Sequence, residues 1–416
     1  MNEGRCGKFC QLAAVRVRCR LQAIMSVHKI SRTTAKMETM LSNNILAAAS
    51  VEPADLIDDL RAVEHWSERI DVERLDAAFR AWAHNSRRAF RADLAIWLRW
   101  CRTNRLDPAR AGASEVARFI RSLVAGEDRQ GRPRAAATIK RYIVHVGRAY
   151  RLLRLVDPTD DELVAYELKA ARKKVGSKQR QALGLRFKGD VVDLDGPEAA
   201  LSLKTLLKAC RRGSYGRLDA LALRNIAMLR VAYDTGLRRS ELVRVEVAHI
   251  EGPDSDGAGR LFIPFSKTDQ EGEGDYAFLS PATMSALKDW LSEGRLKTGP
   301  VFCQIKTHFD GSIAMICKNA LHPNSVGEIY KRLVRTAHER GLLGQMGEVE
   351  LERVVKSISS HSIRVGVAQD NFAAEESLGA IMQAYRWKDP RTVLRYGEKL
   401  AVRGGASARM AKRFAQ

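Results

Sequence analysis

The sequence predicts a mainly α-helical chain with two folded domains, the second of which also contains a small antiparallel sheet. Apolar residues recur at helical spacing through most of the chain, whereas segments 261–265 and 276–279 are short and rich in aromatic and apolar residues. The length of 416 residues, 45% of them apolar, suits two or three domains with buried cores. We expect a poorly ordered basic extension over residues 1–62, a domain of four or five helices over 63–185, and an α+β domain over 190–416.

The chain carries a large positive charge. There are 70 Lys and Arg residues against 49 Asp and Glu residues, which gives a formal net charge of +21. A charge of this size requires a polyanionic partner or strongly basic tails. Nucleic acid is the leading candidate for that partner. An anionic membrane surface is disfavoured, because no run of about 20 apolar residues occurs.

The N-terminal extension is rich in Arg and contains three of the seven cysteines. The cysteines are odd in number, widely spread and without a CxxC pair, which indicates reduced cytosolic thiols and neither a disulfide framework nor a zinc site. We interpret Cys6, Cys10 and Cys19 as unstructured thiols. The extension could imitate an organellar transit peptide, but we favour a poorly ordered leader, with Met25 or Met37 as the true start.

The first domain shows its helices through apolar stripes. One helix has the stripe Phe90, Leu94, Trp97, Leu98 and Cys101, and a second begins near Ser114, a candidate N-cap. A third spans 136–155, with an apolar face made by Ile139, Tyr142, Ile143, Val146, Tyr150 and Leu153.

Basic side chains lie mostly off the apolar face of the helix at 136–155. They are Lys140, Arg141, His145, Arg148 and Arg151. The ordinary interpretation is a solvated face, but in a chain this basic we favour contact with a DNA backbone or major groove.

A basic linker follows the first domain. Residues 169–188 contain eight Lys or Arg residues and no acid before Asp190. Such a run repels itself when free and releases counterions when it binds phosphates, which suits a C-shaped clamp that closes around a duplex. The residues chosen as DNA-binding candidates are Lys140, Arg141, Arg148, Lys173, Lys178 and Arg180.

The second domain alternates helices with one hairpin. Helices are expected at about 200–212, 219–235, 281–293, 325–340, 362–374, 377–385, 390–396 and 398–414. The two predicted strands flank a polar loop that contains Lys267. The basic last helix, near Gly404 and Gly405, is either a frayed terminus or an arm that docks on a neighbouring subunit.

Three short stretches carry side chains suited to phosphate chemistry. His361 and Arg364 are three residues apart, so both face one side of a helical turn and can donate hydrogen bonds to one phosphate. Arg238 follows a turn at Gly236, and Glu241 one helical turn later can hold it. Tyr396 lies in a polar, basic segment, and a phenol oxygen can act as a covalent nucleophile.

The order Arg238, Lys267, His361 with Arg364, Trp387 and Tyr396 resembles the tyrosine recombinase, or phage integrase, family. The chain is most similar to the Cre-like branch of that family. The resemblance rests on TGLRRSEL at 235–242, HSIRVG at 361–366, the segment 381–387 and the box that ends at Tyr396. It extends more weakly over 65–185, which is similar to that branch's SAM-like core-binding domain.

The resemblance implies roles for these residues. Tyr396 attacks the scissile phosphate and leaves a 3′-phosphotyrosine and a free 5′-hydroxyl, while Arg238 and Arg364 stabilise the phosphorane. Lys267 protonates the departing 5′-oxygen as general acid. His361 assists at the phosphate or at the tyrosine.

Two further positions have implied supporting roles. Trp387 stands where many members carry His, and its indole N–H can donate a hydrogen bond but cannot shuttle a proton. Glu241 orients the site. The ordinary alternatives are that Tyr396 and Trp387 pack the last helices and that Glu241 forms a structural ion pair.

The resemblance also implies partners and surroundings. Double-stranded DNA is the partner, and a homotetramer exchanges strands through a Holliday junction, each C-terminal helix docking on its neighbour. No metal, ATP or membrane takes part, and the host is bacterial or phage, with the enzyme at the cytoplasmic nucleoid. Two alternatives remain open: a type IB topoisomerase-like enzyme that nicks and closes one strand, and a degenerate protein that only binds DNA.

Overall fold

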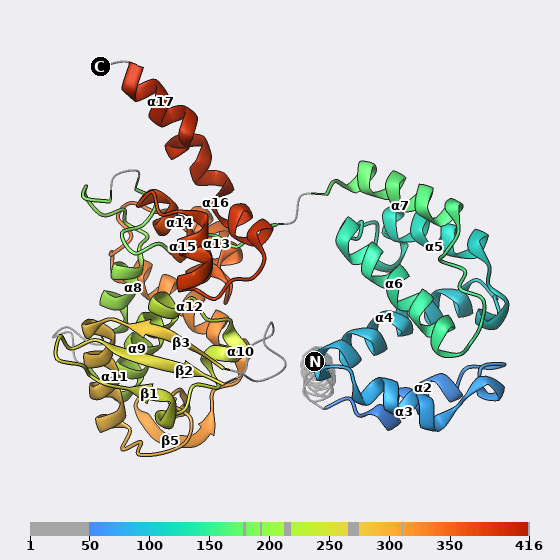
Figure 1. Cartoon of the computed structure of the whole chain (residues 1–416), viewed down its shortest axis with the longest axis horizontal. Coiled ribbons are helices and arrows are strands. Elements are labelled where there is room, and N and C mark those ends of the chain that lie inside the picture. Colours follow the sequence, from blue (N-terminus) through green and yellow to red (C-terminus); the bar gives the residue numbers. More distant parts are fainter. Residues whose placement is uncertain are drawn as a thin grey trace, which may run out of the picture. The chain divides into compact units, whose positions relative to one another are not determined.

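The computed structural model describes residues 50–177, 180–191, 194–211, 218–264, 274–309 and 311–414. The chain divides into two compact units, Met1–Gln179 and Arg180–Gln416 (Figure 1). Both consist mainly of helices, and the second unit contains two small antiparallel sheets, so the predicted fold class is confirmed. Within the described ranges no helix is both long and apolar enough to span a lipid bilayer.

The first unit is built from six helices in the part of the chain that the structure describes. They are α2 (Pro53–Arg61), α3 (Val72–Arg80), α4 (His84–Thr103), α5 (Ala113–Ala125), α6 (Ala136–Leu152) and α7 (Glu162–Val175), joined in places by short 3-10 turns. Their apolar faces meet in one core. The stripe predicted for 136–155 is buried along its whole length, and in α4 only Leu98 of the predicted stripe is partly exposed.

Two details of the first unit differ from the sequence prediction. Helix α2 buries Leu56, Ile57 and Leu60 in the core, so the boundary expected at residue 62 falls one helix too late. Ser114 is not the N-cap of α5. The helix begins at Ala113, and the Gly112 N–H donates to the Glu115 carboxylate at 3.0 Å.

The predicted basic linker is mostly folded. Helix α7 continues to Val175 and therefore includes Lys173, because its apolar face still packs on the first core. Arg186, at the other end of the predicted linker, is a buried residue of the second unit. Lys178 lies outside the described residues.

The second unit is built around a central helix that is apolar on nearly every side. This helix, α9 (Ala220–Thr235), packs against α8 (Leu203–Cys210), α11 (Pro281–Glu293) and α14 (Ser362–Ala373). The other helices are α10 (Arg239–Leu242), α12 (Pro323–Glu339), α13 (Glu348–Ser357), α15 (Leu378–Ala384), α16 (Pro390–Gly404) and α17 (Ala406–Phe414). Helix α13 was not expected from the sequence.

The larger sheet contains the predicted hairpin. Strands β1 (Ile250–Glu251), β2 (Gly259–Ile263) and β3 (Asp275–Leu279) pair antiparallel in that order, with Leu261 opposite Ala277. The first hairpin strand starts and ends two residues earlier than expected. A second hairpin, β4 (Cys303–Thr307) with β5 (Ile313–Ala320), was missed. Lys267 belongs to 265–273, between β2 and β3 and outside the described residues.

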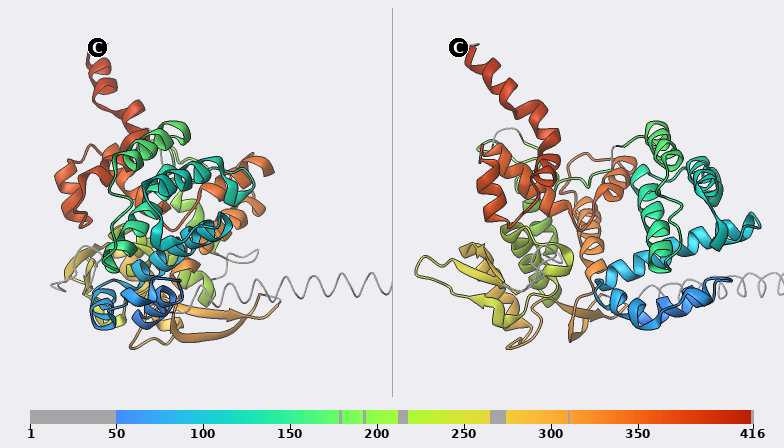
Figure 2. Two further views of the ribbon diagram at one scale, coloured as in Figure 1. Left: turned by 90° about the vertical axis from the view of Figure 1, so that its right-hand side faces the viewer. Right: turned by 45° about the vertical axis from the view of Figure 1, so that its right-hand side comes forward.

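The C-terminal helices are arranged differently from the prediction. Helix α16 runs through residue 396 without a break and ends at Gly404, and α17 begins at Ala406. The predicted helix end at 396 was therefore wrong. Helix α16 packs on α14 and α15, whereas α17 leads away from the rest of the second unit (Figures 1 and 2) and leaves Met410 and Phe414 exposed.

Candidate active site

The start of α14 places two of the predicted residues. The Ser359 N–H donates to the Ser362 hydroxyl at 2.9 Å, and the His361 N–H donates to the Ser359 hydroxyl at 3.1 Å. The second bond satisfies the N–H of the N-cap residue, which has no partner within the helix, and the first bond fixes the turn that precedes it. His361 is exposed at the helix start, and Arg364, one turn along, is 6% exposed.

A tight turn between α9 and α10 places Arg238. Gly236 ends α9 with φ +57°, and a Cβ there would lie 2.9 Å from the Tyr385 ring. The Glu241 carboxylate then accepts both from the backbone N–H of Arg238 and from its guanidinium, each at 2.8 Å. Glu241 therefore fixes both the backbone and the side chain of Arg238.

Glu241 is nearly buried beside two guanidinium groups. Burial would raise the pKa of its carboxyl, but hydrogen bonds from Arg238 and the charges of Arg238 and Arg364 hold that pKa below its ordinary value. The carboxylate is thus charged and gives the site one negative charge among several positive ones.

Arg364 contacts most of the other members of the site. Its guanidinium donates to the Gly236 carbonyl and lies over the Trp387 ring, 4.4 Å from the ring centroid. Burial, with the charge of Arg238, lowers the pKa of Arg364 to about 10, although the Tyr396 phenol and the Glu241 carboxylate oppose this change. Arg364 therefore stays protonated near neutral pH and lies against Trp387, which also contacts Tyr396.

Trp387 packs against side chains of two helices, Arg364 of α14 and Tyr396 of α16. The indole is 4% exposed and meets the Tyr396 ring edge to face, with centroids 5.7 Å apart and planes at 79°. Its Nε1–H is buried and has no hydrogen-bond partner among the described residues. Tyr396 is half-buried on α16.

The charges of the site favour an anion. Desolvation of the imidazole lowers the pKa of His361, and the charges of Arg364, Arg239 and Arg238 lower it further, so the neutral form is favoured. Two guanidinium groups converge here with one carboxylate to offset them. A group with several negative oxygens, such as a phosphate, suits this arrangement.

The predicted DNA-binding residues have mixed surroundings. Arg141 donates through Nε and Nη2 to the buried carboxylate of Asp93, at 2.7 and 2.9 Å, and His145 Nδ1 lies 2.7 Å from the same group. Arg148 lies over the Trp82 ring at 4.8 Å. Lys140, Lys173 and Arg180 are exposed.

The prediction that α6 presents only positive charge outward is therefore corrected. Asp93 neutralises part of that face, and Arg151 pairs with Asp157. The sequence analysis missed Asp93, although an acid inside the apolar stripe of α4 is a signal of a buried ion pair.

Comparisons with known proteins bear on the same part of the chain. Residues 200–402 match the sequence model of the phage integrase family. The chain is 26% identical over 322 residues to recombinase cre of Escherichia phage P1, which covers 76% of this chain and 84% of that protein.

Two solved structures are more distantly similar. The XerH site-specific recombinase bound to palindromic difH substrate has 14% identity, a TM-score of 0.46 and coverage of 78% of this chain and 79% of that chain. The Tn1549 transposon integrase in complex with transposon right end DNA has 13% identity, a TM-score of 0.47 and coverage of 81% and 95%.

Proposed function

Because residues 200–402 belong to the phage integrase family of tyrosine recombinases, we propose that this chain cleaves and rejoins duplex DNA through a 3′-phosphotyrosine bond to Tyr396. This chemistry would make the chain a tyrosine-type site-specific DNA recombinase. The observation that supports it most strongly is that Trp387 packs against both the Arg364 guanidinium and the Tyr396 ring within one chain.

The proposed reaction is an in-line displacement at phosphorus. The Tyr396 oxygen forms a bond to the scissile phosphorus, the bond from phosphorus to the 5′-oxygen breaks, and the phenol proton leaves as the 5′-oxygen gains one. Arg238 and Arg364 donate to the non-bridging oxygens, where negative charge develops, and Glu241 holds Arg238 in place beforehand. The phosphotyrosine conserves the energy of the phosphodiester, so rejoining requires neither ATP nor a metal.

Three groups are proposed to move or hold protons. Lys267 protonates the leaving 5′-oxygen as general acid. Neutral His361 accepts the phenol proton or donates to the phosphate, which its lowered pKa favours. Trp387 supports the Arg364 guanidinium with its ring, and its unpartnered Nε1–H becomes a donor to the phosphate when DNA binds.

The assembly on DNA is also a proposal. Four copies would exchange strands in pairs through a Holliday junction, with α17 of each copy docking on a neighbour. The exposed Met410 and Phe414 of α17 support this, because four-residue spacing places both on one side of a helix that leaves its own unit. The clamp of both units around a duplex remains a prediction.

A covalent-capture experiment tests the central proposal. Sequencing of source-genome DNA that the wild-type chain captures gives the target site, and a nicked suicide duplex of that site then traps the adduct. Tyr396→Phe should keep DNA affinity and form no adduct, because the nucleophilic oxygen is gone. The matched control Tyr385→Phe, which alters a tyrosine that also contacts Trp387, should still form it. An undiminished adduct with Tyr396→Phe would refute the nucleophile.

A further inference from the structure

A short extended segment at the start of the second unit lies directly on α14. We call residues 181–187 the strap. The Leu183 N–H donates to the Ser357 carbonyl at 2.9 Å, and the Leu185 N–H donates to the Ser362 carbonyl at 2.8 Å. A Cβ on Gly366 would lie 2.1 Å from the Leu185 carbonyl oxygen. The strap is therefore in backbone contact with the helix that carries His361 and Arg364.

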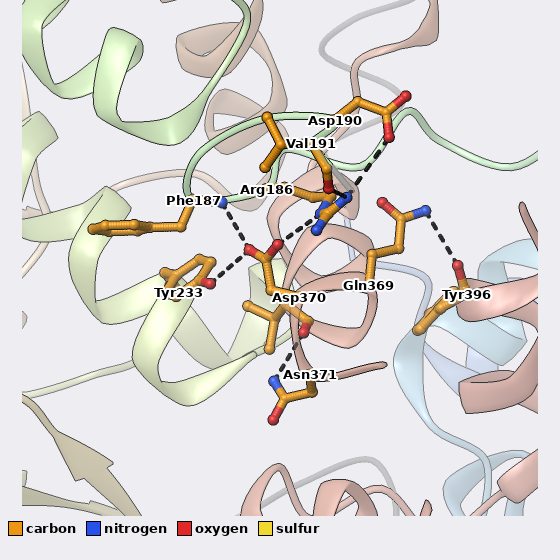
Figure 3. Close-up of polar contacts among 10 residues, drawn as sticks. Arg186, Phe187, Asp190, Val191, Tyr233, Gln369, Asp370, Asn371 and Tyr396 are labelled. Carbon is orange, nitrogen blue, oxygen red and sulfur yellow. Dashed lines mark hydrogen bonds and ion pairs between the residues drawn. The ribbon is translucent and has the colours of Figure 1, made fainter. Parts of the chain in front are cut away.

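A buried ion pair anchors the strap to α14. Arg186, 2% exposed, donates from Nε to Asp370 at 2.6 Å, and the Phe187 N–H donates to the other oxygen of that carboxylate at 2.7 Å (Figure 3). Tyr233 of α9 donates to the same oxygen at 2.6 Å. Separating Arg186 from Asp370 would leave the buried Asp370 carboxylate without its cationic partner, so the strap stays on α14.

The strap and α14 both contact the backbone of the helix that carries the nucleophile. Gln181 of the strap donates from Nε2 to the Arg395 carbonyl at 3.2 Å. Gln369 of α14 donates from Nε2 to the Tyr396 carbonyl, also at 3.2 Å (Figure 3). The carbonyls of two consecutive residues of α16 thus each accept a hydrogen bond from a glutamine. One glutamine belongs to the strap and the other to α14.

We propose that Gln181 and Gln369 are positioning residues for Tyr396. They fix the rotation and axial position of α16 so that the Tyr396 side chain stays against Trp387 on the side of Arg364, and the Arg186–Asp370 pair fixes the strap that carries Gln181. The inference rests on the proposed function, in which Tyr396 is the nucleophile. The strap begins one residue after Arg180, so the same stretch of chain joins a predicted DNA contact to the nucleophile helix.

The test replaces each glutamine by methionine, which keeps the length of the side chain but cannot donate. Gln345→Met, at an exposed position in the loop before α13, is the control. We expect Gln369→Met and Gln181→Met each to slow single-turnover adduct formation roughly 10-fold, and the double variant about 100-fold, because small misplacements of a reacting atom are costly. DNA affinity and Tm should match the wild type.

A sulfur-substituted duplex separates positioning from proton supply. A 5′-bridging sulfur leaves as a thiolate and needs no general acid. The Lys267→Ala variant should therefore regain its rate of adduct formation on this substrate. The rates of Gln369→Met and Gln181→Met should stay low. If the two glutamine variants formed the adduct at the wild-type rate on this substrate, the glutamines would act in proton transfer to the leaving group. That result would overturn the proposal. Wild-type rates in both variants, or losses of DNA affinity equal to the losses of rate, would also overturn it.

Hydrogen exchange of the full chain without DNA gives a readout independent of the reaction. Gln369→Met should speed exchange of the backbone amides of α16 and leave those of α9 unchanged. If the wild type forms no adduct, the proposed function fails and this measurement alone decides the positioning claim. Unchanged exchange in α16 would then overturn it.

Discussion

At the scale of single residues, Trp387 connects Arg364 and Tyr396, the two groups on which the proposed reaction depends. One face of its indole carries the Arg364 guanidinium, and its ring meets the Tyr396 ring edge to face. A buried donor without a partner destabilises a protein, and Trp387 Nε1–H is such a donor among the described residues. This cost makes functional sense if a phosphate accepts the hydrogen bond in the complex.

Substitution of Trp387 by Phe tests that interpretation. Trp387→Phe should leave the free energy of unfolding unchanged or higher, yet slow adduct formation about tenfold, the loss of one hydrogen bond to a charged group. Trp290→Phe is the matched control. Its indole donates to the Val301 carbonyl at 2.7 Å, so that variant should lose stability and keep its rate. Adduct kinetics give the rate of each variant, and chemical denaturation gives its free energy of unfolding. A wild-type rate in Trp387→Phe would contradict the phosphate contact.

The charge on Glu241 predicts a dependence of stability on pH. Its pKa is lower in the folded chain than the ordinary 4.5, so the unfolded chain binds the proton more readily. The stabilisation is therefore complete above the ordinary value and is lost as the pH falls through the folded value. The difference in unfolding free energy between wild type and Glu241→Gln should shrink on acidification, measured by denaturation across this range. A difference independent of pH would contradict the charged pair with Arg238.

At the scale of elements, contiguous motifs were predictable and distant contacts were not. The HSIRVG box could be recognised because His361 and Arg364 share one helical turn. The Arg186–Asp370 pair joins residues 184 positions apart, and no local pattern reports such a pair. The end of α16 was misjudged because Gly397 lies inside the helix. A Cβ there would lie 2.5 Å from the Phe372 ring, so glycine permits the close packing of α16 on α14.

Helix α6 shows the same limit in the first unit. Its basic residues were visible in the sequence, but the acid that pairs with Arg141 and His145 comes from α4. The hairpin β4–β5 was missed because its strands are largely exposed and lack a clean alternation of apolar and polar residues.

The pairing of α4 with α6 predicts a specific loss of stability. Asp93 is 2% exposed, and its removal leaves the partly buried His145 and one edge of the Arg141 guanidinium without their acceptor. Asp93→Ala should lower the free energy of unfolding by about 2 kcal/mol. The control Asp59→Ala breaks an exposed pair with Arg91 and should cost less than about 1 kcal/mol. Equal losses in chemical denaturation would contradict a structural role for Asp93.

At the scale of the whole molecule, length and charge predicted two folded parts and a DNA partner. The division itself falls at residues 179 and 180, inside the stretch expected to be a linker, because the strap already belongs to the second unit. The proposed assembly of several copies would use surfaces that have no partner within one chain, and the sequence offers only a basic C-terminal helix as a hint of it.

Removal of that helix separates recombination from cleavage. A chain ending at Gly404 retains α16 with Tyr396, so it should form the adduct at the wild-type rate, but it should not invert or delete DNA between two target sites on one plasmid. The full chain should do both. Relaxation of the plasmid by the full chain without exchange would instead favour a type IB topoisomerase-like activity, and exchange by the shortened chain would remove the role of α17.

Identification of the amino acid that carries the DNA tests the central claim most directly. The adduct on a suicide duplex can be digested with protease and nuclease, and the modified peptide sequenced by mass spectrometry. We predict one modified residue, Tyr396, joined to the 3′ end of the cleaved strand. A nucleotide on any other residue, or on Tyr396 through a 5′ end, would contradict the account.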